Sequence, residues 1–304
     1  MTLLVVGSVA FDAVSSPRGK VDRMLGGSAT YFSVAASYFT QVQVVGVVGD
    51  DFGEEHHSVF TERKIGTEGL ERVPGKTFFW SGEYNADMNE RTTLDTQLNV
   101  FASFQPKLPP HYRKSPYLFL GNIDPELQSL VQGQMEAPTL IAGDTMNFWI
   151  EGKRAELEKM LRGLHAVIIN DSEARQFSGE YNLLKAARAI RALGPSTVVI
   201  KRGDNGATMF REKEVFCAPA LPLEEIFDPT GAGDSFAGGF MGYLASRGAA
   251  AQGSEENDFR RAMIYGSVMG SFTVEKFGLE RLRQLSREQI DARFQQFQRL
   301  VQVD

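Results

Sequence analysis

The strongest constraint on the fold of this chain is an alternation of short apolar strands and helices. Strands are predicted at 117–121, 139–142, 166–169 and 197–200, with helices at 126–132, 155–162 and 180–193 between them. This alternation is typical of a parallel sheet with helices on both faces, because parallel strands need a crossover connection. Further strands are predicted at 3–9 and 43–48, and further helices at 29–38, 234–246, 260–276 and 287–301. We therefore expect an α/β fold.

Composition excludes several classes of protein. The 304 residues are 42% hydrophobic and 23% charged, which is ordinary for a globular protein with a large core. The net charge of −6 argues against a protein that binds nucleic acid by neutralising phosphates. No apolar run is long enough to span a membrane, and the first residues read as a strand rather than a signal peptide. Cys217 is the only cysteine, so no intrachain disulfide can form, which fits a cytoplasmic protein.

Polar residues collect where the predicted strands stop, at Asp12, Asp144, Asn170 and Lys201. The carboxyl ends of parallel strands share one edge of a sheet, and ligands bind at that edge in open α/β folds. We therefore expect these side chains to lie on one rim. Asp12, after the first strand, is a candidate substrate contact; the alternative is a turn-forming aspartate.

A glycine-rich loop leads directly into a helix in the stretch from Asp228 to Phe240. Gly231 and Gly233 allow a ligand to approach the backbone closely, and a helix start presents free N–H groups and a positive dipole end to an anion. Asp234 then stands in the first helical turn. It is either a favourable partner for the helix dipole or a catalytic base beside a bound phosphate.

Two other segments are candidates for the nucleotide and metal side of such a site. Asn170 and Glu173 stand three residues apart, as in a capping box, and Glu173 is alternatively a ligand that holds Mg²⁺ through water. Lys201, Gly203 and Gly206 form a strand end and a tight turn, which would be a hairpin or, beside a nucleotide, a source of contacts to phosphate or ribose. No Walker A pattern or dinucleotide fingerprint is present.

Residues 70–110 depart from the α/β rhythm. The segments 77–84 and 92–100 are β-rich and are joined by a polar turn, which predicts an antiparallel excursion. Together with residues 12–24, it would form a lid, a dimer surface or an extension of the sheet. Arg91, at the tip, is a candidate anion contact on the substrate side.

The motifs together resemble the ribokinase-like (PfkB) carbohydrate kinase family. The resemblance rests on Asp228-Pro229-Thr230-Gly231-Ala232-Gly233-Asp234, on Gly26-Gly27, on Asn170 with Glu173, and on the turn from Lys201 to Gly206. It covers nearly the whole chain. It implies one Rossmann-like domain over residues 1–304, with a small β lid, that uses ATP and Mg²⁺ to phosphorylate an alcohol.

The resemblance also implies roles for particular residues. Asp234 would be the general base, and Gly231, Ala232 and Gly233 the anion hole. Asp12, Gly26 and Gly27 would bind the substrate, while Asn170 and Glu173 would organise Mg²⁺ and phosphate. Asp228 and Thr230 match positions where some members hold a monovalent cation such as K⁺. Adenine would lie near Ser267 and Gly270.

Two departures from the family pattern concern the substrate. Many members have an asparagine shortly after the glycine pair, where this chain has Ser28 to Tyr31, and the Asp-x-Asn-x-Arg pattern of some sugar kinases is not reproduced at Asp144. The leading hypothesis is a cytoplasmic ATP-dependent kinase for the primary hydroxyl of a sugar or a closely related small molecule. A nucleoside kinase is the alternative, since an aromatic lid would also suit a base, and a catalytically silent sugar-binding protein is the alternative of another class. We expect no partner beyond the small-molecule substrate, except a second copy paired through the lid.

Overall fold

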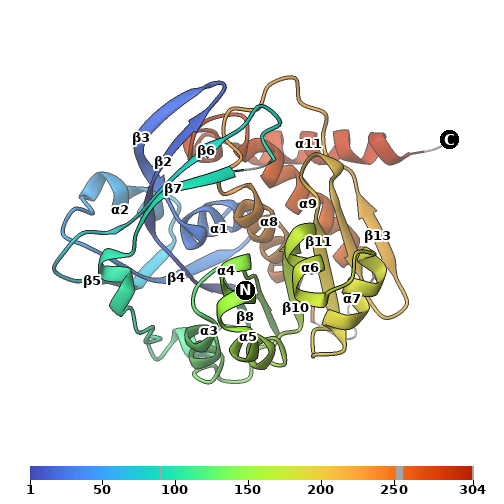
Figure 1. The fold of residues 1–304 in the computed structure, drawn as a ribbon, viewed down its shortest axis with the longest axis horizontal. Helices are drawn as coiled ribbons and strands as arrows, with labels where there is room; N and C mark the ends of the chain where they lie inside the picture. The colour runs from blue at the N-terminus through green and yellow to red at the C-terminus, as the bar shows by residue number, and fades with distance from the viewer. Residues whose placement is uncertain (90, 251–255, 303–304) are drawn as a thin grey trace.

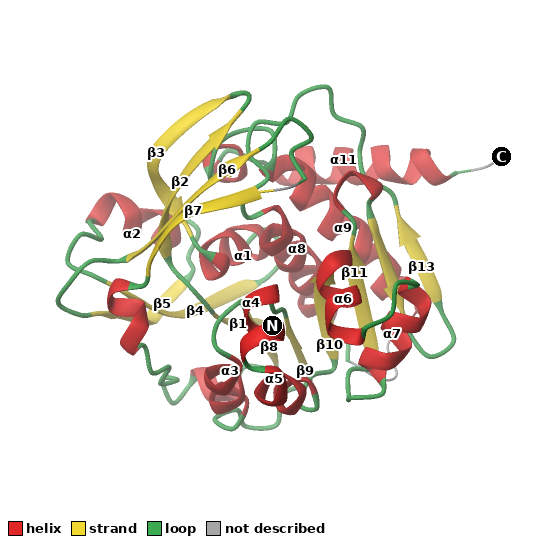
Figure 2. Ribbon diagram, in the orientation of Figure 1, coloured by secondary structure: helices red, strands yellow, loops and turns green. Residues whose placement is uncertain are grey.

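The computed structural model describes residues 1–89, 91–250 and 256–302. Within them the chain forms a large sheet of nine strands and a small sheet of four strands, with helices packed around the large sheet (Figures 1 and 2). The small sheet lies to one side, above the end of the large sheet that carries β4 and β5. None of the described helices is both long and apolar enough to cross a membrane.

The large sheet has the strand order β13-β12-β11-β10-β9-β8-β1-β4-β5. Its strands are β1 (Thr2–Val6), β4 (Gln41–Val48), β5 (Gly66–Arg72), β8 (Tyr117–Leu120), β9 (Leu140–Gly143), β10 (Ala166–Asn170), β11 (Thr197–Lys201), β12 (Ala207–Phe210) and β13 (Val215–Ala218). All neighbouring pairs are parallel except β11 with β12 and β12 with β13. The prediction of a mostly parallel α/β sheet is therefore confirmed.

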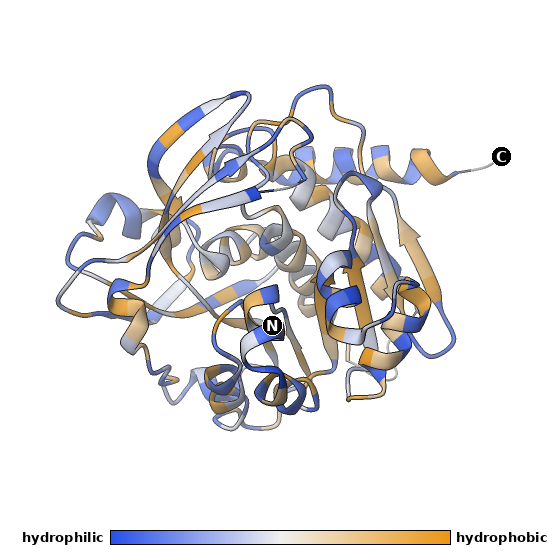
Figure 3. Cartoon of the chain, in the orientation of Figure 1, coloured by the Kyte–Doolittle hydropathy of each residue, from blue (hydrophilic) through white to orange (hydrophobic). Residues whose placement is uncertain are grey.

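Helices cover both faces of the large sheet. They are α1 (Ser28–Ala36), α2 (Glu54–Thr61), α3 (Pro125–Gln132), α4 (Asn147–Gly152), α5 (Arg154–Leu161), α6 (Asp171–Ser178), α7 (Leu183–Arg191), α8 (Ala232–Arg247), α9 (Glu256–Thr273), α10 (Glu280–Arg283) and α11 (Arg287–Val301). In β1, Leu3 and Val5 pack into the core with α1, α8 and α9, whereas Leu4 and Val6 pack into the core with α5 and α7. A strand buried on both faces explains the continuous apolar runs, visible as orange strands in Figure 3.

The small sheet has the order β3-β2-β6-β7 and consists of β2 (Ala10–Ser16), β3 (Gly19–Gly26), β6 (Phe78–Tyr84) and β7 (Arg91–Gln97). The hairpin of β6 and β7 is antiparallel, as predicted, and so is the hairpin of β2 and β3. The two hairpins join through a parallel pairing of β2 with β6, in which Asp12 lies opposite Trp80. That pairing links segments far apart in the chain. The residue pattern within either segment does not predict it.

The prediction of a first strand over residues 3–9 is wrong at the carboxyl end. The large sheet keeps only Thr2–Val6 of it, and the chain then crosses to the small sheet. The crossing is fixed by two hydrogen bonds: Ser8 N–H donates to Ser28 Oγ at 3.2 Å, and Ser28 N–H donates to Ser8 Oγ at 3.0 Å. Asp12 therefore lies in β2 of the small sheet and not at the carboxyl end of a large-sheet strand.

Helix α8 runs through the core between α1 and α9. A Cβ on Gly238 would lie 2.5 Å from the carbonyl oxygen of Phe32 in α1, and a Cβ on Gly239 would lie 2.6 Å from that of Tyr265 in α9. Only glycine allows both neighbours to approach so closely, which explains the small residues noted in this helix. The packing holds the start of α8, and hence Asp234, in a fixed place at the rim of the sheet.

Candidate active site

The site is centred on the first turn of α8. Gly231 caps the helix with φ of 74°, a left-handed conformation that favours glycine. Ala232 N–H donates to the carbonyl oxygen of Pro229 at 3.1 Å, whereas helix geometry leaves the next N–H, that of Gly233, without an intrahelical carbonyl partner. The glycine loop therefore leads directly into the helix, as predicted, and the N–H of Gly233 can receive an anion, whereas that of Ala232 is already bonded.

Asp234 lies half-buried in this first turn. Removal from water raises the pKa of Asp234, while the positive charges of Lys201 and Arg91 lower it in part. A carboxylate whose pKa is raised toward neutral pH is a stronger base than an ordinary surface aspartate. The same position at a helix start also favours its negative charge, so the dipole and base interpretations are compatible.

Lys201 reaches the start of α8 from the neighbouring strand end. Its Nζ lies so near Gly233 that a Cβ on that glycine would be 2.7 Å away. Lys201 stands opposite Asn170 in the parallel register of β11 and β10, so both strand ends meet at one edge of the sheet. The predicted rim is thus confirmed for these two residues.

Asn170 and Glu173 form a capping box at the start of α6. Asn170 Oδ1 accepts a hydrogen bond from Glu173 N–H at 2.8 Å, and Glu173 Oε2 accepts one from Asn170 N–H, also at 2.8 Å. Burial raises the pKa of Glu173, while the positive charge of Lys201 lowers it. The structural role of the pair is therefore established, and it leaves the second carboxylate oxygen of Glu173 available.

Asp144 is a site residue to which the sequence assigned no role beyond its place at a strand end. It is buried directly after β9, and its Oδ1 has no hydrogen-bond partner among the described residues. Burial raises the pKa of Asp144 well above its usual range, and the negative charge of Asp234 raises it further. The position after a strand was the only signal in the sequence, since the expected family pattern around it is absent.

Asp12 reaches the same region from the small sheet. A Cβ on Gly26 would lie 1.9 Å from Asp12 Oδ2, so this glycine makes room for the carboxylate. Gly27 has φ of 94°, and hydrogen bonding by its backbone lowers the pKa of Asp12 in part. Burial, followed by the negative charge of Asp228, raises the pKa of Asp12 to about 7. The glycine pair and Asp12 are therefore brought together, with Asp12 in the small sheet, as the expected lid over residues 12–24 implied, and not at the end of the first strand.

Asp228 and Thr230 tie the glycine loop to its surroundings. Asp228 accepts from Thr230 N–H at 2.8 Å through Oδ1 and from Gly278 N–H at 3.0 Å through Oδ2. Thr230 Oγ1 donates to the hydroxyl of Tyr84 in β6 at 3.2 Å. Both oxygens of Asp228 thus hold backbone N–H groups, and Thr230 connects the loop to the small sheet.

The remaining predicted residues border this centre. Gly203 and Gly206 form the turn of the β11–β12 hairpin, and a Cβ on Gly203 would lie 2.5 Å from Asn89 Oδ1 of the β6–β7 turn. Gly270 packs on the start of α8, where its Cβ would lie 3.3 Å from the carbonyl oxygen of Ala232. Ser267 is half-buried one turn earlier in α9. Arg91 begins β7, and its charge acts on Asp12, Glu173 and Asp234 alike.

These residues fit a nucleotide and a hydrated divalent ion. Gly233 supplies a free N–H beside Lys201, and Asp144 Oδ1 and the free oxygen of Glu173 are the hard oxygen ligands that Mg²⁺ prefers. No group of three or more metal-binding side chains occurs in the part of the chain that the structure describes. Mg²⁺ retains much of its water in proteins and is usually bound by one or two carboxylates and by substrate phosphates.

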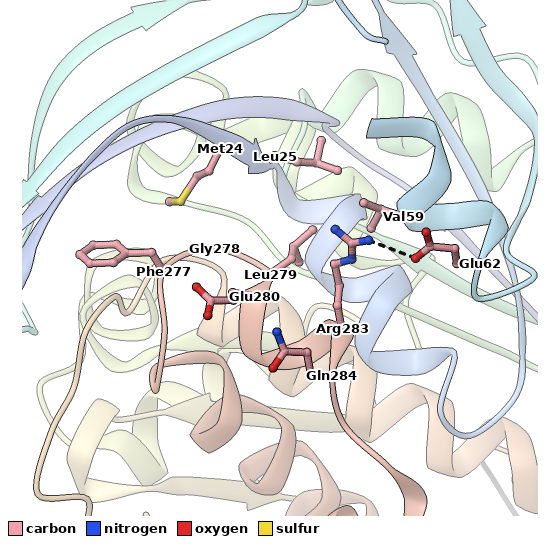
Figure 4. Close-up of a pocket in the computed structure, with 10 residues that line it drawn as sticks. All are labelled: Met24, Leu25, Val59, Glu62, Phe277, Gly278, Leu279, Glu280, Arg283 and Gln284. Atoms are coloured by element: carbon pink, nitrogen blue, oxygen red, sulfur yellow. Dashed lines mark hydrogen bonds and ion pairs between the residues drawn. The ribbon is translucent and has the colours of Figure 1, made fainter. Parts of the chain in front are cut away.

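A separate cavity of about 530 Å³ lies between β3, α2 and the segment 277–284 (Figure 4). Met24, Leu25 and Val59 line one side, and Arg283 makes an ion pair with Glu62 at 3.0 Å across its edge. Gly278 lies in its wall, and its N–H donates a hydrogen bond to Asp228 Oδ2. None of the residues predicted for the catalytic site lines this cavity.

Comparisons with known proteins agree with this geometry. Residues 141–284 match the model of the pfkB family carbohydrate kinases. A cytidine kinase of Thermococcus kodakarensis is 30% identical over 257 residues, which cover 81% of this chain and 90% of that protein. The chain therefore belongs to the pfkB family of carbohydrate kinases. It is an ATP-dependent kinase, and membership implies use of a divalent metal ion.

Solved structures show the same fold. The nucleoside kinase of Methanocaldococcus jannaschii, an archaeal member of the ribokinase family, aligns with a TM-score of 0.75 at 16% identity, covering 97% of this chain and 98% of that one. A fructokinase of Vibrio cholerae aligns with a TM-score of 0.77 at 16% identity, covering 96% and 98%. These likenesses establish the ribokinase-like fold, including the small sheet.

The raised pKa of Asp12 predicts that Asp12→Asn increases the free energy of unfolding by an amount that depends on pH. Because the folded-state pKa is about 7 and the unfolded value is 3.8, the folded state holds the proton more tightly, and ionisation costs stability as the pH rises between these values. Asparagine removes that cost, so the free energy of unfolding should exceed that of the unmodified chain by an amount that grows from pH 5 to pH 8, to at most about 4 kcal/mol. Denaturant unfolding at each pH measures it.

The matched control is Asp22→Asn, at an exposed position of the neighbouring strand β3. Its stability should stay within about 0.5 kcal/mol of the unmodified chain throughout. A gain from Asp12→Asn that is the same at pH 5 and pH 8 would contradict the assigned ionisation.

Proposed function

We propose that this kinase transfers the γ-phosphoryl group of ATP to the primary hydroxyl of a nucleoside. The observation that carries the proposal is that Asp12, which is paired in register with Trp80 in the small sheet, lies near enough to Asp234 for the charge of Asp234 to raise its pKa. The similarity to a cytidine kinase over most of both chains supports it, as does the fold shared with a nucleoside kinase of Burkholderia thailandensis solved with inosine.

The small sheet is proposed to act as a lid that binds the nucleoside. Asp12 and Trp80 are direct neighbours in the β2–β6 register, and such neighbours point to the same face of a sheet. Tyr84 is four residues further along β6, on that same face, and its hydroxyl contacts Thr230 of the glycine loop. Trp80 is only half-buried, so its indole is a surface on which a base can stack.

In the proposed reaction, Asp234 takes the proton of the primary hydroxyl as general base. The hydroxyl oxygen attacks the γ-phosphorus, and the bond from that phosphorus to the bridging oxygen breaks, so that ADP leaves with the electron pair. The anion hole at Gly231, Ala232 and Gly233, with Lys201, stabilises the charge of the moving phosphoryl group. The N–H of Gly233 suits this role, because helix geometry leaves it without an intrahelical carbonyl partner.

The other predicted residues bind the two substrates. Asp12, Gly26, Gly27 and Arg91 are proposed on the nucleoside side, and Asn170, Gly203, Gly206, Ser267 and Gly270 on the ATP side. Glu173, with Asp144, would hold the divalent ion, which we take to be Mg²⁺. When bound, the ion neutralises phosphate charge.

A monovalent cation such as K⁺ is proposed near Asp228 and Thr230. Burial raises the pKa of Asp228, so a nearby cation would stabilise its charged form. A rate that is the same in K⁺ and in a large organic cation would refute this site.

A homodimer through the lid is also proposed. All seven residues of β7 are exposed, including Leu94 at 59%, and β7 is the edge strand of the small sheet. An exposed edge strand is a ready surface for pairing with a second chain. Sedimentation of a monomer at all concentrations would refute it. We place the protein in the cytoplasm, where ATP is available, and fractionation of cells would test this.

A free sugar is the second candidate acceptor. Asp12 would bind sugar hydroxyls equally well, and the fold is shared with a fructokinase. The two candidates differ at Trp80, since only a nucleoside carries a base that can stack there.

A turnover screen separates these candidates. ATP consumption should be measured with nucleosides, ketoses, aldoses and polyols, for the unmodified chain and for Trp80→Leu. We expect turnover of a nucleoside, and a KM for that nucleoside at least about 5-fold higher in Trp80→Leu, because base stacking is lost. Turnover of free sugars alone, with no effect of Trp80→Leu, would establish the second candidate. Binding of a sugar with no turnover of any acceptor would favour the silent binder.

Asp234→Asn tests the general base. Asparagine keeps the size of the side chain and cannot take a proton, so kcat should fall about 10²–10⁴-fold while ATP binding is retained. Steady-state kinetics and calorimetric titration of ATP give the two quantities. A variant with near-normal kcat would rule out the role.

Glu173→Gln tests the metal role apart from the capping box. Glutamine can still accept the hydrogen bond from Asn170 N–H, so the thermal stability should be preserved. The Mg²⁺ concentration for half-maximal rate should rise about 10-fold or more, because a charged ligand is lost. The control is Asp171→Asn, in the same helical turn but paired with Arg175. An unchanged Mg²⁺ requirement in Glu173→Gln would leave the residue as a helix cap only.

A further inference from the structure

Tyr31 of α1 carries a buried hydroxyl without a partner. Its side chain is 1% exposed, and its hydroxyl makes no hydrogen bond within the described residues. Buried polar groups are nearly always hydrogen-bonded, so such a group calls for an explanation. The hydroxyls of Thr30 and Ser33 in the same helix also lack partners in the described part of the chain, but they can turn back to carbonyls of their own helix. The phenol of Tyr31 is too long for that.

The position of the ring places this hydroxyl in the candidate site. The ring of Tyr31 lies on Gly231, where a Cβ would be 2.3–2.4 Å from three of its carbons. Burial raises the pKa of Tyr31 well above its usual value, and the negative charges of Asp228 and Asp12 raise it further. The hydroxyl therefore stays protonated, and three carboxylates act on it: Asp228 most strongly, then Asp12 and Asp234, between which the acceptor would bind.

The chemistry of the surroundings defines the missing partner. When they are ionised, Asp12 and Asp234 only accept hydrogen bonds, so the hydroxyls of a bound sugar ring donate to them. Each sugar oxygen then has lone pairs left that need a donor, and Tyr31 supplies a buried donor at the base of the site. A ribose hydroxyl or ring oxygen has this property, whereas an apolar group would leave the phenol unpaired.

We propose that the hydroxyl of Tyr31 donates a hydrogen bond to an oxygen of the acceptor's sugar ring and thereby determines which acceptors are used. This inference rests on the proposed function, because it concerns the acceptor of that reaction. It assigns a specificity role to the segment that departs from the family pattern after the glycine pair.

The variant Tyr31→Phe tests the inference, because phenylalanine keeps the ring against Gly231 and removes only the hydroxyl. The KM for the acceptor should rise about 3–10-fold, with the KM for ATP unchanged. The melting temperature of the free protein should rise by about 1–4 °C, because an unpaired buried group is removed. A purely structural role for the hydroxyl would give the opposite result, a lower melting temperature and an unchanged KM.

Tyr117→Phe is the matched control. Tyr117 is also fully buried, but its hydroxyl donates to the carbonyl oxygen of Ala249 at 2.9 Å. Removal of the Tyr117 hydroxyl should lower the melting temperature and leave the KM for the acceptor and the KM for ATP unchanged.

Acceptor analogues that lack one sugar oxygen complete the test. For the analogue without the contacted oxygen, the unmodified chain and Tyr31→Phe should have the same KM, whereas every other analogue should keep the difference. An unchanged acceptor KM in Tyr31→Phe, or a fall in melting temperature like that of Tyr117→Phe, would overturn the inference and leave the proposed function intact. Absence of turnover by the unmodified chain would instead overturn the proposed function, and this inference with it.

Discussion

The candidate site depends on the burial of several carboxylates around one lysine at the start of α8. Asp144 is buried and Asp234 is half-buried, and burial raises the pKa of each while the charge of Lys201 lowers it in part. Each unit of pKa shift corresponds to about 1.4 kcal/mol, so this cluster lowers the free energy of unfolding. A purely structural protein would gain nothing from that loss. Buried groups with shifted pKa values gather at functional sites, where the shift serves the chemistry.

The large sheet provides this cluster through strand register. Asn170 and Lys201 are opposite each other at the ends of β10 and β11, and Asp144 follows β9 beside them. Helix α8 brings Asp234 to the same edge, because close contacts at Gly238 and Gly239 fix it between α1 and α9. The catalytic geometry is therefore a consequence of how the core packs.

The small sheet adds a second wall, which carries Asp12 and Arg91 toward the site. Thr230 joins the two parts through Tyr84, and Asn89 of the β6–β7 turn lies against Gly203 of the β11–β12 hairpin. Movement of the small sheet would therefore displace both the glycine loop and the β11–β12 turn. Such an arrangement suits an enzyme that must exclude water from a phosphoryl group during transfer.

Local patterns were sufficient to predict much of this site. The alternation of strands and helices indicated the parallel sheet, and the glycine loop before Asp234 and the capping box at Asn170 are each encoded within a few neighbouring residues. The position of Asp12 was not predictable in this way, because the turn after Val6 depends on Ser28, 20 residues beyond Ser8. The pairing of β2 with β6 and the contact of Tyr31 with Gly231 also join distant segments, so only the folded chain reveals them.

The central claim is that the start of α8 holds the moving phosphoryl group while Asp234 faces the acceptor hydroxyl. A crystal structure with ADP, a planar metal-fluoride mimic of the phosphoryl group and a nucleoside would test it most directly. The account predicts the mimic at the N–H groups of the Gly231–Gly233 loop, with an Asp234 oxygen about 2.6–3.2 Å from the primary hydroxyl. A mimic bound away from this loop, or a primary hydroxyl out of reach of Asp234, would contradict it.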